Sequence, residues 1–150
     1  MEKMPSIGQF RNAVREVRER CKYEDISLPK LRFMGTIKLH GTNAGIAYRN
    51  GDISYQSKNR VIKIGDDHAG FAAHMNKHEK SVGWLIDEVK SIFSLTEQDE
   101  FTIYGEWCGE GIQKGVGITG LPKMFVIFAL KINGVWKTIM DRNFNINNRT

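Results

Sequence analysis

Two Asn-Gly pairs, Asn50-Gly51 and Asn133-Gly134, constrain the fold of this chain more than any other feature of its sequence. An Asn-Gly pair favours the two-residue turn of a β-hairpin, because both central residues of that turn adopt positive φ angles. Each pair separates two strand-like runs, which are Ala44–Arg49 and Asp52–Lys58 in the first case and Lys123–Ile132 and Val135–Met140 in the second. The sequence therefore predicts two antiparallel hairpins.

Apolar periodicity in the rest of the chain predicts three helices and two further strands. Ser6 is expected to cap the first helix, with Gln9 completing a capping box. The arginines of that helix fit either a solvated face or a surface that contacts phosphates. A polar connection covers Asn59 to Asp67, and a glycine-rich loop covers Gly109–Gly120. The expected helices are Ser6–Cys21, Phe71–Lys80 and Ser81–Phe93, and the expected strands are Arg32–Leu39 and Glu100–Cys108. Together these elements predict an α+β domain with mainly antiparallel sheets and flanking helices.

Composition narrows the class of protein. A length of 150 residues suits one domain spanning residues 1–150, and a net charge of +5 suits a polyanionic partner. No apolar run approaches the roughly 20 residues that cross a bilayer, and the N-terminus lacks the apolar core of a signal peptide. The two cysteines, Cys21 and Cys108, favour a reducing compartment over a disulfide framework. We therefore expect a cytoplasmic protein with no membrane partner.

Lys38 stands out in the run from Phe33 to Asn43, where strand-like apolar residues lead into a turn of His, Gly, Thr and Asn. The neighbours of this lysine are expected to be buried. Burial disfavours the ammonium form of a lysine, and this is one way in which a lysine becomes a nucleophile. The pattern indicates a lysine placed for covalent chemistry, although a lone lysine at a strand end usually has no such role.

Three histidines, His68, His74 and His78, raise the possibility of a metal site. His74 and His78 are four residues apart, which places two ligands on one helical face in some zinc sites. The glutamate that follows the first histidine in zinc proteases is absent, and Lys77 and Lys80 would repel a cation. A solvated helix explains the histidines better, so we expect no protein-held metal cluster.

Three further segments along the chain contain residues that suit catalysis or ligand binding. They are Gln56–Arg60 with two cations, Tyr104–Lys114 with Glu106 in an apolar setting, and the aromatic run Phe125–Phe128. Together with the segment Lys38-Leu39-His40-Gly41-Thr42-Asn43 they resemble ATP-dependent RNA ligases of the phage RNA ligase 2 and RNA-editing ligase type. The first segment is similar to that family's K-x-H-G-T-N motif, and the glutamate segment is similar to G-E-x-x-G-x-G-I-Q-K. A further hypothesis is a DNA ligase or an mRNA capping enzyme. These proteins usually have K-x-D-G-x-R in place of the first motif, so His40 and Asn43 argue against them.

The resemblance implies a nucleotidyltransferase domain that is partly ATP-grasp-like, and it implies a role for each matching residue. Lys38 would attack the α-phosphorus of ATP and hold AMP covalently, and His40 would orient the departing pyrophosphate. Asn43 would act in later steps on RNA. Glu106 would bind the ribose hydroxyls, and Phe128 would stack on adenine.

The same resemblance implies the partners and cofactors. AMP would pass to the 5′-phosphate end of an RNA, and a 3′-hydroxyl end would then displace it to seal the strand. ATP and Mg²⁺ (or Mn²⁺) would be required, because phosphoryl transfer needs positioned cations and a divalent metal. Arg60, or alternatively Lys58, would contact the ribose and phosphates; Asn59 separates these two, whereas the family has an adjacent Lys-Arg pair. If the gene is viral, the protein would act in the cytoplasm of a phage-infected host cell.

The chain departs from the family pattern in two further ways. Ala129 stands where the family commonly has an aspartate, and no counterpart of the family's last two motifs, with their metal-binding glutamate and two lysines, follows Met140. We therefore expect a domain truncated before those motifs. The alternative to an active RNA ligase is a catalytically incomplete nucleotide- or RNA-binding fragment, or one half of a split ligase completed by a C-terminal partner.

Overall fold

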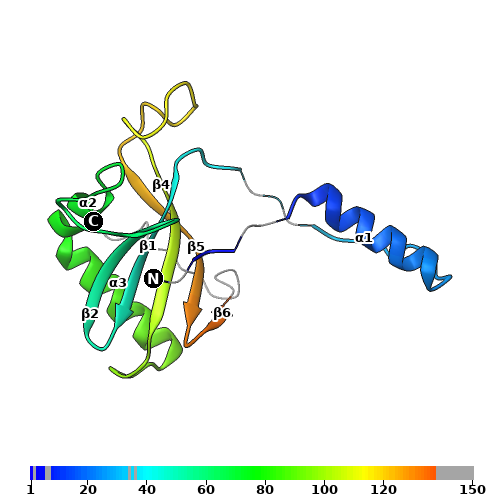
Figure 1. Cartoon of the computed structure of the whole chain (residues 1–150), viewed down its shortest axis with the longest axis horizontal. Helices are drawn as coiled ribbons and strands as arrows, with labels where there is room; N and C mark the ends of the chain where they lie inside the picture. The colour runs from blue at the N-terminus through cyan, green and yellow to red at the C-terminus, as the bar shows by residue number, and fades with distance from the viewer. Residues whose placement is uncertain (2, 6–7, 34, 36, 138–150) are drawn as a thin grey trace. The chain divides into compact units, whose positions relative to one another are not determined.

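A computed structural model describes residues 1, 3–5, 8–33, 35 and 37–137. The chain forms two compact units, the smaller spanning Met4–Lys38 and the larger comprising Met1–Lys3 and Leu39–Thr150 (Figure 1).

The smaller unit contains one helix, α1 (Phe10–Tyr23), among its described residues. The predicted start at Ser6 is wrong, because the helix begins four residues later with Gln9 as its N-cap in an extended conformation. The Gln9 carbonyl accepts the first helical hydrogen bond from the Asn12 N–H, at 2.8 Å. Gly8 immediately precedes this cap, and a glycine inside a helix costs close to 1 kcal/mol relative to alanine. Ser6 itself lies outside the described residues.

The predicted strand Arg32–Leu39 is also wrong: its described residues form no strand. Ile37 is 90% exposed and Phe33 is 59% exposed, so the run is not the buried strand that its apolar residues suggested. Phe33 packs edge-on against Phe10 instead, with ring centroids 4.6 Å apart. A strand needs a hydrogen-bonding neighbour, and every strand pairing among the described residues lies within the larger unit.

The larger unit is built on one six-stranded sheet of order β3-β2-β1-β4-β5-β6, in which every neighbouring pair is antiparallel. Both predicted hairpins are confirmed. Asn50 and Gly51 have φ angles of 51° and 87°, and Asn133 and Gly134 have φ angles of 47° and 79°, as this turn type requires. The strands are β1 (Thr42–Arg49), β2 (Asp52–Ser57), β3 (Val61–Ile62), β4 (Phe101–Cys108), β5 (Met124–Ile132) and β6 (Val135–Lys137).

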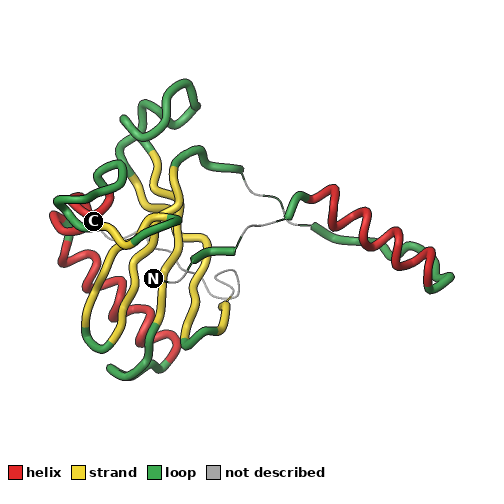
Figure 2. The backbone as a smooth tube through the Cα atoms, viewed as in Figure 1, coloured by secondary structure: helices red, strands yellow, loops and turns green. Residues whose placement is uncertain are grey.

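Two helices, α2 (Phe71–Lys77) and α3 (Glu79–Phe93), cover one face of this sheet (Figure 2). The break between them falls at His78, two residues before the predicted boundary, where φ is −111° and ψ is 36°. The buried core joins both helices to alternate residues of the central strands, including Phe71, Leu85, Val89, Ile46 and Ile103. The α+β architecture is therefore the expected one. The short strand β3 was not expected, because it lies within the run predicted as a polar connection.

The two faces of the sheet are distinguished by side-chain parity. Ala44 and Ile46 of β1 and Ile103 and Trp107 of β4 point toward the helices, and we call this the helix face. Residues between them, such as Asn43 and Glu106, point the other way, and we call this the far face.

Strand β5 contains a bulge that interrupts its alternation. Gly105 pairs with Ile127 and Tyr104 pairs with Ala129, so Phe128 is the extra residue. Ile127 and Leu130 both pack in the core despite being three residues apart. Phe128 is 42% exposed and is turned out of that core.

Among the described residues, no helix is both long and apolar enough to cross a membrane. The predicted end of the last strand at Met140 lies outside the described residues, and the described part of this strand ends at Lys137.

Candidate functional site

Both backbone groups of Gly41, in the turn that follows Lys38 and His40, are hydrogen-bonded, one to β4 and the other to the loop that follows β4. The Gly41 N–H donates to Glu106 Oε1 at 2.9 Å. The Gln113 side-chain amide donates to the Gly41 carbonyl oxygen at 3.2 Å. Two residues of the segment that resembles G-E-x-x-G-x-G-I-Q-K therefore hold the segment that resembles K-x-H-G-T-N.

The close approach at Gly41 explains why this position is glycine. A Cβ atom at residue 41 would press against the carbonyl oxygen of Trp107 and lie 2.6 Å from Cβ of Cys108. Carbon atoms normally pack about 3.5–4.0 Å apart, so any side chain here would push the turn away from β4.

Thr42 gives the same turn a further attachment. Its Oγ1 lies 2.7 Å from Nε2 of His68, a residue of the loop that precedes α2. The next residue, Asn43, is half-buried and pairs directly with Glu106 in the β1–β4 register. Cross-strand partners in direct register share a face of the sheet, so Asn43 and Glu106 are neighbours on the far face.

Phe128 belongs to β5, the strand next to Glu106. Glu106 pairs with Val126, and the bulge follows immediately on β5. Because the bulge turns Phe128 away from the core, a partly exposed aromatic ring is available beside the strand that carries the carboxylate. Three adjacent strands thus supply Asn43, Glu106 and Phe128, an amide, a carboxylate and an aromatic ring.

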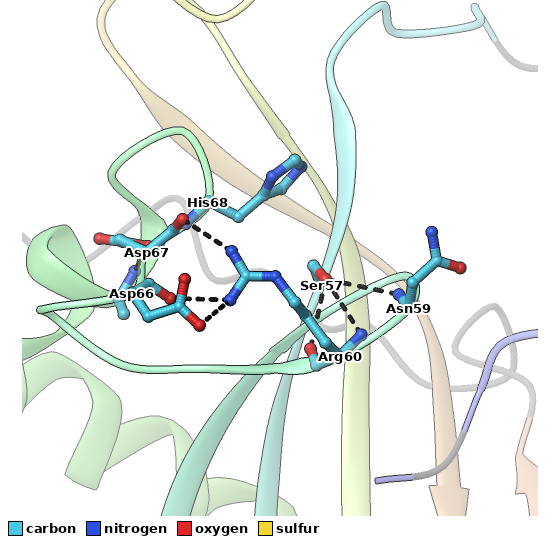
Figure 3. Close-up of polar contacts among 7 residues, drawn as sticks. Ser57, Asn59, Arg60, Asp66, Asp67 and His68 are labelled. Atoms are coloured by element: carbon cyan, nitrogen blue, oxygen red, sulfur yellow. Dashed lines mark hydrogen bonds and ion pairs between the residues drawn. The ribbon is translucent and has the colours of Figure 1, made fainter.

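Lys58 and Arg60, the two cations predicted to contact the ribose and phosphates, follow β2 and differ in their surroundings. Arg60 forms an ion pair with the Asp66 carboxylate, and its guanidinium also donates to the backbone carbonyls of Asp66 and Asp67, each at 3.1 Å (Figure 3). Lys58 has an exposed side chain. The Arg60 charge is therefore already partly neutralised by a carboxylate.

The loop that receives Arg60 is held rigidly by Asp67. Its carboxylate accepts the backbone N–H groups of His68 at 2.6 Å and of Ala72 and Ala73 at 2.9 Å. Burial raises the pKa of the Asp67 carboxyl, but these three hydrogen bonds and the His68 charge outweigh it and hold the pKa below its ordinary value. Asp67 thus caps the start of α2 and orders the loop that carries His68 (Figure 3).

Lys38 and His40 do not lie in the buried setting expected from the sequence. Lys38 is the last residue of the smaller unit and its side chain is exposed, and His40, in the larger unit, is exposed as well. The expectation of burial around Lys38 is wrong because Ile37 and Phe33 are themselves exposed. The structure brings Asn43, Glu106 and Phe128 together on adjacent strands. Lys38 belongs to the smaller unit and precedes Gly41 by three residues along the chain.

The donor set bears on how a divalent metal could bind. Within the described part of the chain, no three His, Cys, Asp or Glu side chains are gathered as ligands. Mg²⁺ at phosphoryl-transfer sites is usually held by one or two carboxylates together with substrate phosphates and water, so such a site does not require a protein-built cage.

Sequence reasoning gave no role to Gln113 or Asp66, and it weighed His68 only as a metal ligand. Gln113 lies in the glycine-rich loop, and Asp66 lies in the run predicted as a polar connection. The Asp-Asp-His run just before an apolar helical pattern was a usable signal, because an aspartate there commonly caps the helix.

Comparison with known proteins agrees with this geometry. No curated protein matches the chain. A family model described as RNA ligase matches residues 31–144, which contain both the lysine turn and all three strands that carry the candidate residues. This protein belongs to the RNA ligase family.

Proposed function

We propose that this protein is an ATP-dependent RNA ligase that forms a covalent lysyl-AMP at Lys38. The observation that carries the proposal is the double attachment of Gly41 to Glu106 and Gln113. These bonds fasten the turn after the lysine to Glu106, whose carboxylate would bind the nucleotide, and to the loop that follows its strand. The subfamily we favour is that of phage RNA ligase 2 and the RNA-editing ligases, on the K-x-H-G-T-N pattern.

In the proposed first step, Nζ of Lys38 attacks the α-phosphorus of ATP as a free amine. A nitrogen–phosphorus bond forms, the bond to the bridging oxygen breaks, and pyrophosphate leaves as the amine loses its proton. His40 orients the departing pyrophosphate. Mg²⁺ (or Mn²⁺) would be bound mainly through the phosphates and would supply charge neutralisation there.

In the next two steps AMP moves from Lys38 to the 5′-phosphate of an RNA end, and a 3′-hydroxyl then attacks that phosphate and releases AMP. Asn43 serves these later steps. Its pairing with Glu106 across β1 and β4 supports this, because a residue beside the nucleotide carboxylate is well placed to act on the activated end.

The proposed contacts with adenosine lie on the far face of the sheet. A carboxylate has about four lone-pair sites, so Glu106 can keep its bond to Gly41 and still accept from ribose hydroxyls. Phe128 offers a partly exposed ring for stacking on adenine. Lys58 and Arg60 contact the ribose or phosphates, and Lys58 is free of the ion pair that engages Arg60 with Asp66.

The direct test is covalent labelling. The protein is incubated with α-labelled ATP and Mg²⁺, and acid-labile, protein-bound label is measured. Label is expected in the wild type and in Lys30→Ala, an exposed lysine of the same unit, and not in Lys38→Ala. GTP is not expected to replace ATP.

Two outcomes would count against the proposal. Equal labelling by GTP and ATP would oppose the RNA ligase assignment. An unlabelled wild type that still binds ATP would identify a nucleotide-binding fragment, and recovery of label on adding a separately expressed C-terminal segment would identify a split ligase.

A further inference from the structure

A cleft on the helix face is separate from the site proposed for ATP. It has a volume of about 590 Å³ and lies between the α2–α3 pair and strands β1 and β5. Its lining includes Ile46, Phe125 and Ile127, which point toward the helices, whereas Asn43 and Glu106 point to the far face. We call this the helix-side cleft and define it by His74, His78, Lys80, Trp84 and Phe125.

The cleft has an apolar floor and a cationic rim. Phe125 and Ile127 form part of the floor, and His74, His78 and Lys80 line it with polar groups. The His74 and His78 rings are stacked with centroids 4.3 Å apart. A volume of this size lies within the range of about 300–1,000 Å³ that is usual for small-molecule and nucleotide sites.

Positive charge surrounds His74. Burial lowers the pKa of His74, and the charges of His78, Lys123 and Lys77 lower it further. Lys77, Lys80 and Lys123 all have exposed side chains. Burial raises the pKa of the Tyr55 hydroxyl, and the charge of Glu79, the acidic residue next to Lys80 in sequence, raises it further. The rim therefore favours an anionic occupant over an apolar or cationic one.

Trp84 adds an aromatic surface to this rim. It lines the cleft, lies four residues after Lys80 on α3 and remains 38% exposed. Residues four apart on a helix share a face, so the indole and the ammonium group are presented together. Cations interleaved with an accessible aromatic ring are the elements that bind single-stranded nucleic acid, in which bases stack and phosphates pair with lysines.

We propose that the helix-side cleft binds one unpaired nucleotide of the RNA strand, with its base against Trp84 and its phosphate against Lys80. This site rests on the proposed function for the identity of its strand, but it takes no part in the reaction at Lys38. It extends RNA contact to the face of the sheet opposite the adenosine pocket.

The test uses a short oligoribonucleotide with a 5′-hydroxyl and a blocked 3′ end, which binds but cannot be adenylylated or joined. Binding is followed by fluorescence anisotropy and by quenching of tryptophan emission. We expect quenching in the wild type and in Trp136→Phe, but not in Trp84→Phe. Trp136 is a matched control because it is 39% exposed, close to the 38% of Trp84.

Affinity gives a second, independent readout. Trp84→Ala is expected to weaken binding about tenfold, and Trp84→Phe to restore most of it, since a phenyl ring still stacks. Lys80→Gln is expected to weaken binding a few-fold and to reduce the slope of log affinity against log salt by about 0.7, whereas Lys137→Gln leaves the slope unchanged. Covalent AMP labelling at Lys38 is expected to stay at the wild-type level in all of these variants.

Several results would overturn the inference. Equal quenching of Trp84 by a base-free polyphosphate would reduce the cleft to a simple cationic surface. Unchanged affinity in Trp84→Ala, or a Trp84-dependent shift from dimer to monomer with no RNA binding, would exclude a nucleotide as the occupant. Loss of labelling in Lys38→Ala with intact Trp84 quenching would leave both proposals standing, whereas an unlabelled wild type that is quenched would refute only the ligase chemistry.

Discussion

Replacing Gly41 by alanine tests whether the attachment of the lysine turn to β4 controls the chemistry. The new Cβ would lie 2.6 Å from Cβ of Cys108 and against the Trp107 carbonyl. Cys108 and Trp107 are both fully buried in β4, so the turn must move instead. To reach normal contact it must retreat by about 1 Å. The Gly41 bonds to Glu106 and Gln113, now 2.9 Å and 3.2 Å, would then exceed hydrogen-bonding distance.

The expected effect of Gly41→Ala is larger on catalysis than on stability. Losing one charged and one neutral hydrogen bond at a partly solvated turn costs about 2 kcal/mol, measured as the free energy of unfolding in urea. A displacement of about 1 Å near Lys38, the proposed nucleophile, is expected to lower the rate of Lys38 labelling about 100-fold.

Two comparison variants separate these effects. Gly65→Ala is the control, because no atom lies within 4 Å of a Cβ built there, and it is expected to behave as wild type. Gln113→Ala removes one of the two bonds without a clash and is expected to slow labelling by an intermediate amount. Wild-type labelling by a folded Gly41→Ala protein would refute the reasoning, because the turn would then be displaced without consequence.

Three further changes probe the cap, the core and the adenosine pocket. Asp67→Asn is expected to destabilise the protein by about 1 kcal/mol at pH 7, as loss of a helix cap does. The pKa of Asp67 is lower in the folded protein than in the unfolded chain, where it is about 3.9. The Asp67 carboxylate therefore stabilises the fold above the unfolded pKa, and this stabilisation is lost as pH falls through the folded pKa. The unfolding free energies of wild type and Asp67→Asn, measured in urea, should converge below pH 4. Tyr48→Phe removes a buried hydroxyl that is hydrogen-bonded to Lys90 at 2.7 Å and to Glu97. It should lower the urea midpoint of unfolding by an amount equivalent to about 1 kcal/mol. The control Tyr23→Phe, at a position that is 91% exposed, should leave the midpoint unchanged. Phe128→Ala is expected to raise the KM for ATP about tenfold, and Phe128→Tyr to leave it near the wild-type value, because the tyrosine ring still stacks.

Local signals predicted the hairpins and both helices of the larger unit. The Asn50-Gly51 and Asn133-Gly134 turns act within a few residues, and the apolar periodicity of Ser81–Phe93 reports a single buried stripe. The end of that helix at Phe93 also follows the expectation, and Ser94 continues with a left-handed φ of 53°. Such features need no knowledge of distant parts of the chain.

The prediction for Arg32–Leu39 failed for the opposite reason. Apolar composition gives a segment strand propensity, but a strand forms only when a neighbour supplies the ladder hydrogen bonds. That neighbour is a property of the tertiary fold, and Phe33 found an aromatic partner in Phe10 instead. The ion pair between Arg60 and Asp66 could not be predicted from the sequence either. The sequence shows a cation near the end of a strand, but only the fold shows which carboxylate lies beside it.

Predicting the position of Phe128 requires both the local apolar spacing of β5 and the strand pairing of the folded sheet. In a regular strand, Phe125 and Ile127 facing the helices would leave Leu130 and Ile132 on the far face, because parity alternates along the whole strand. All four pack in or against the core, so one residue between them must be extra, and the register shows that it is Phe128. The apolar spacing of β5 therefore requires an extra residue between Ile127 and Leu130, and the register places it at Phe128, the aromatic residue that we propose stacks on adenine. Deleting Phe128 would restore alternation and keep the core intact, so a folded protein that cannot retain ATP is the expected result. Retention of ATP by that variant would show that adenine is held elsewhere.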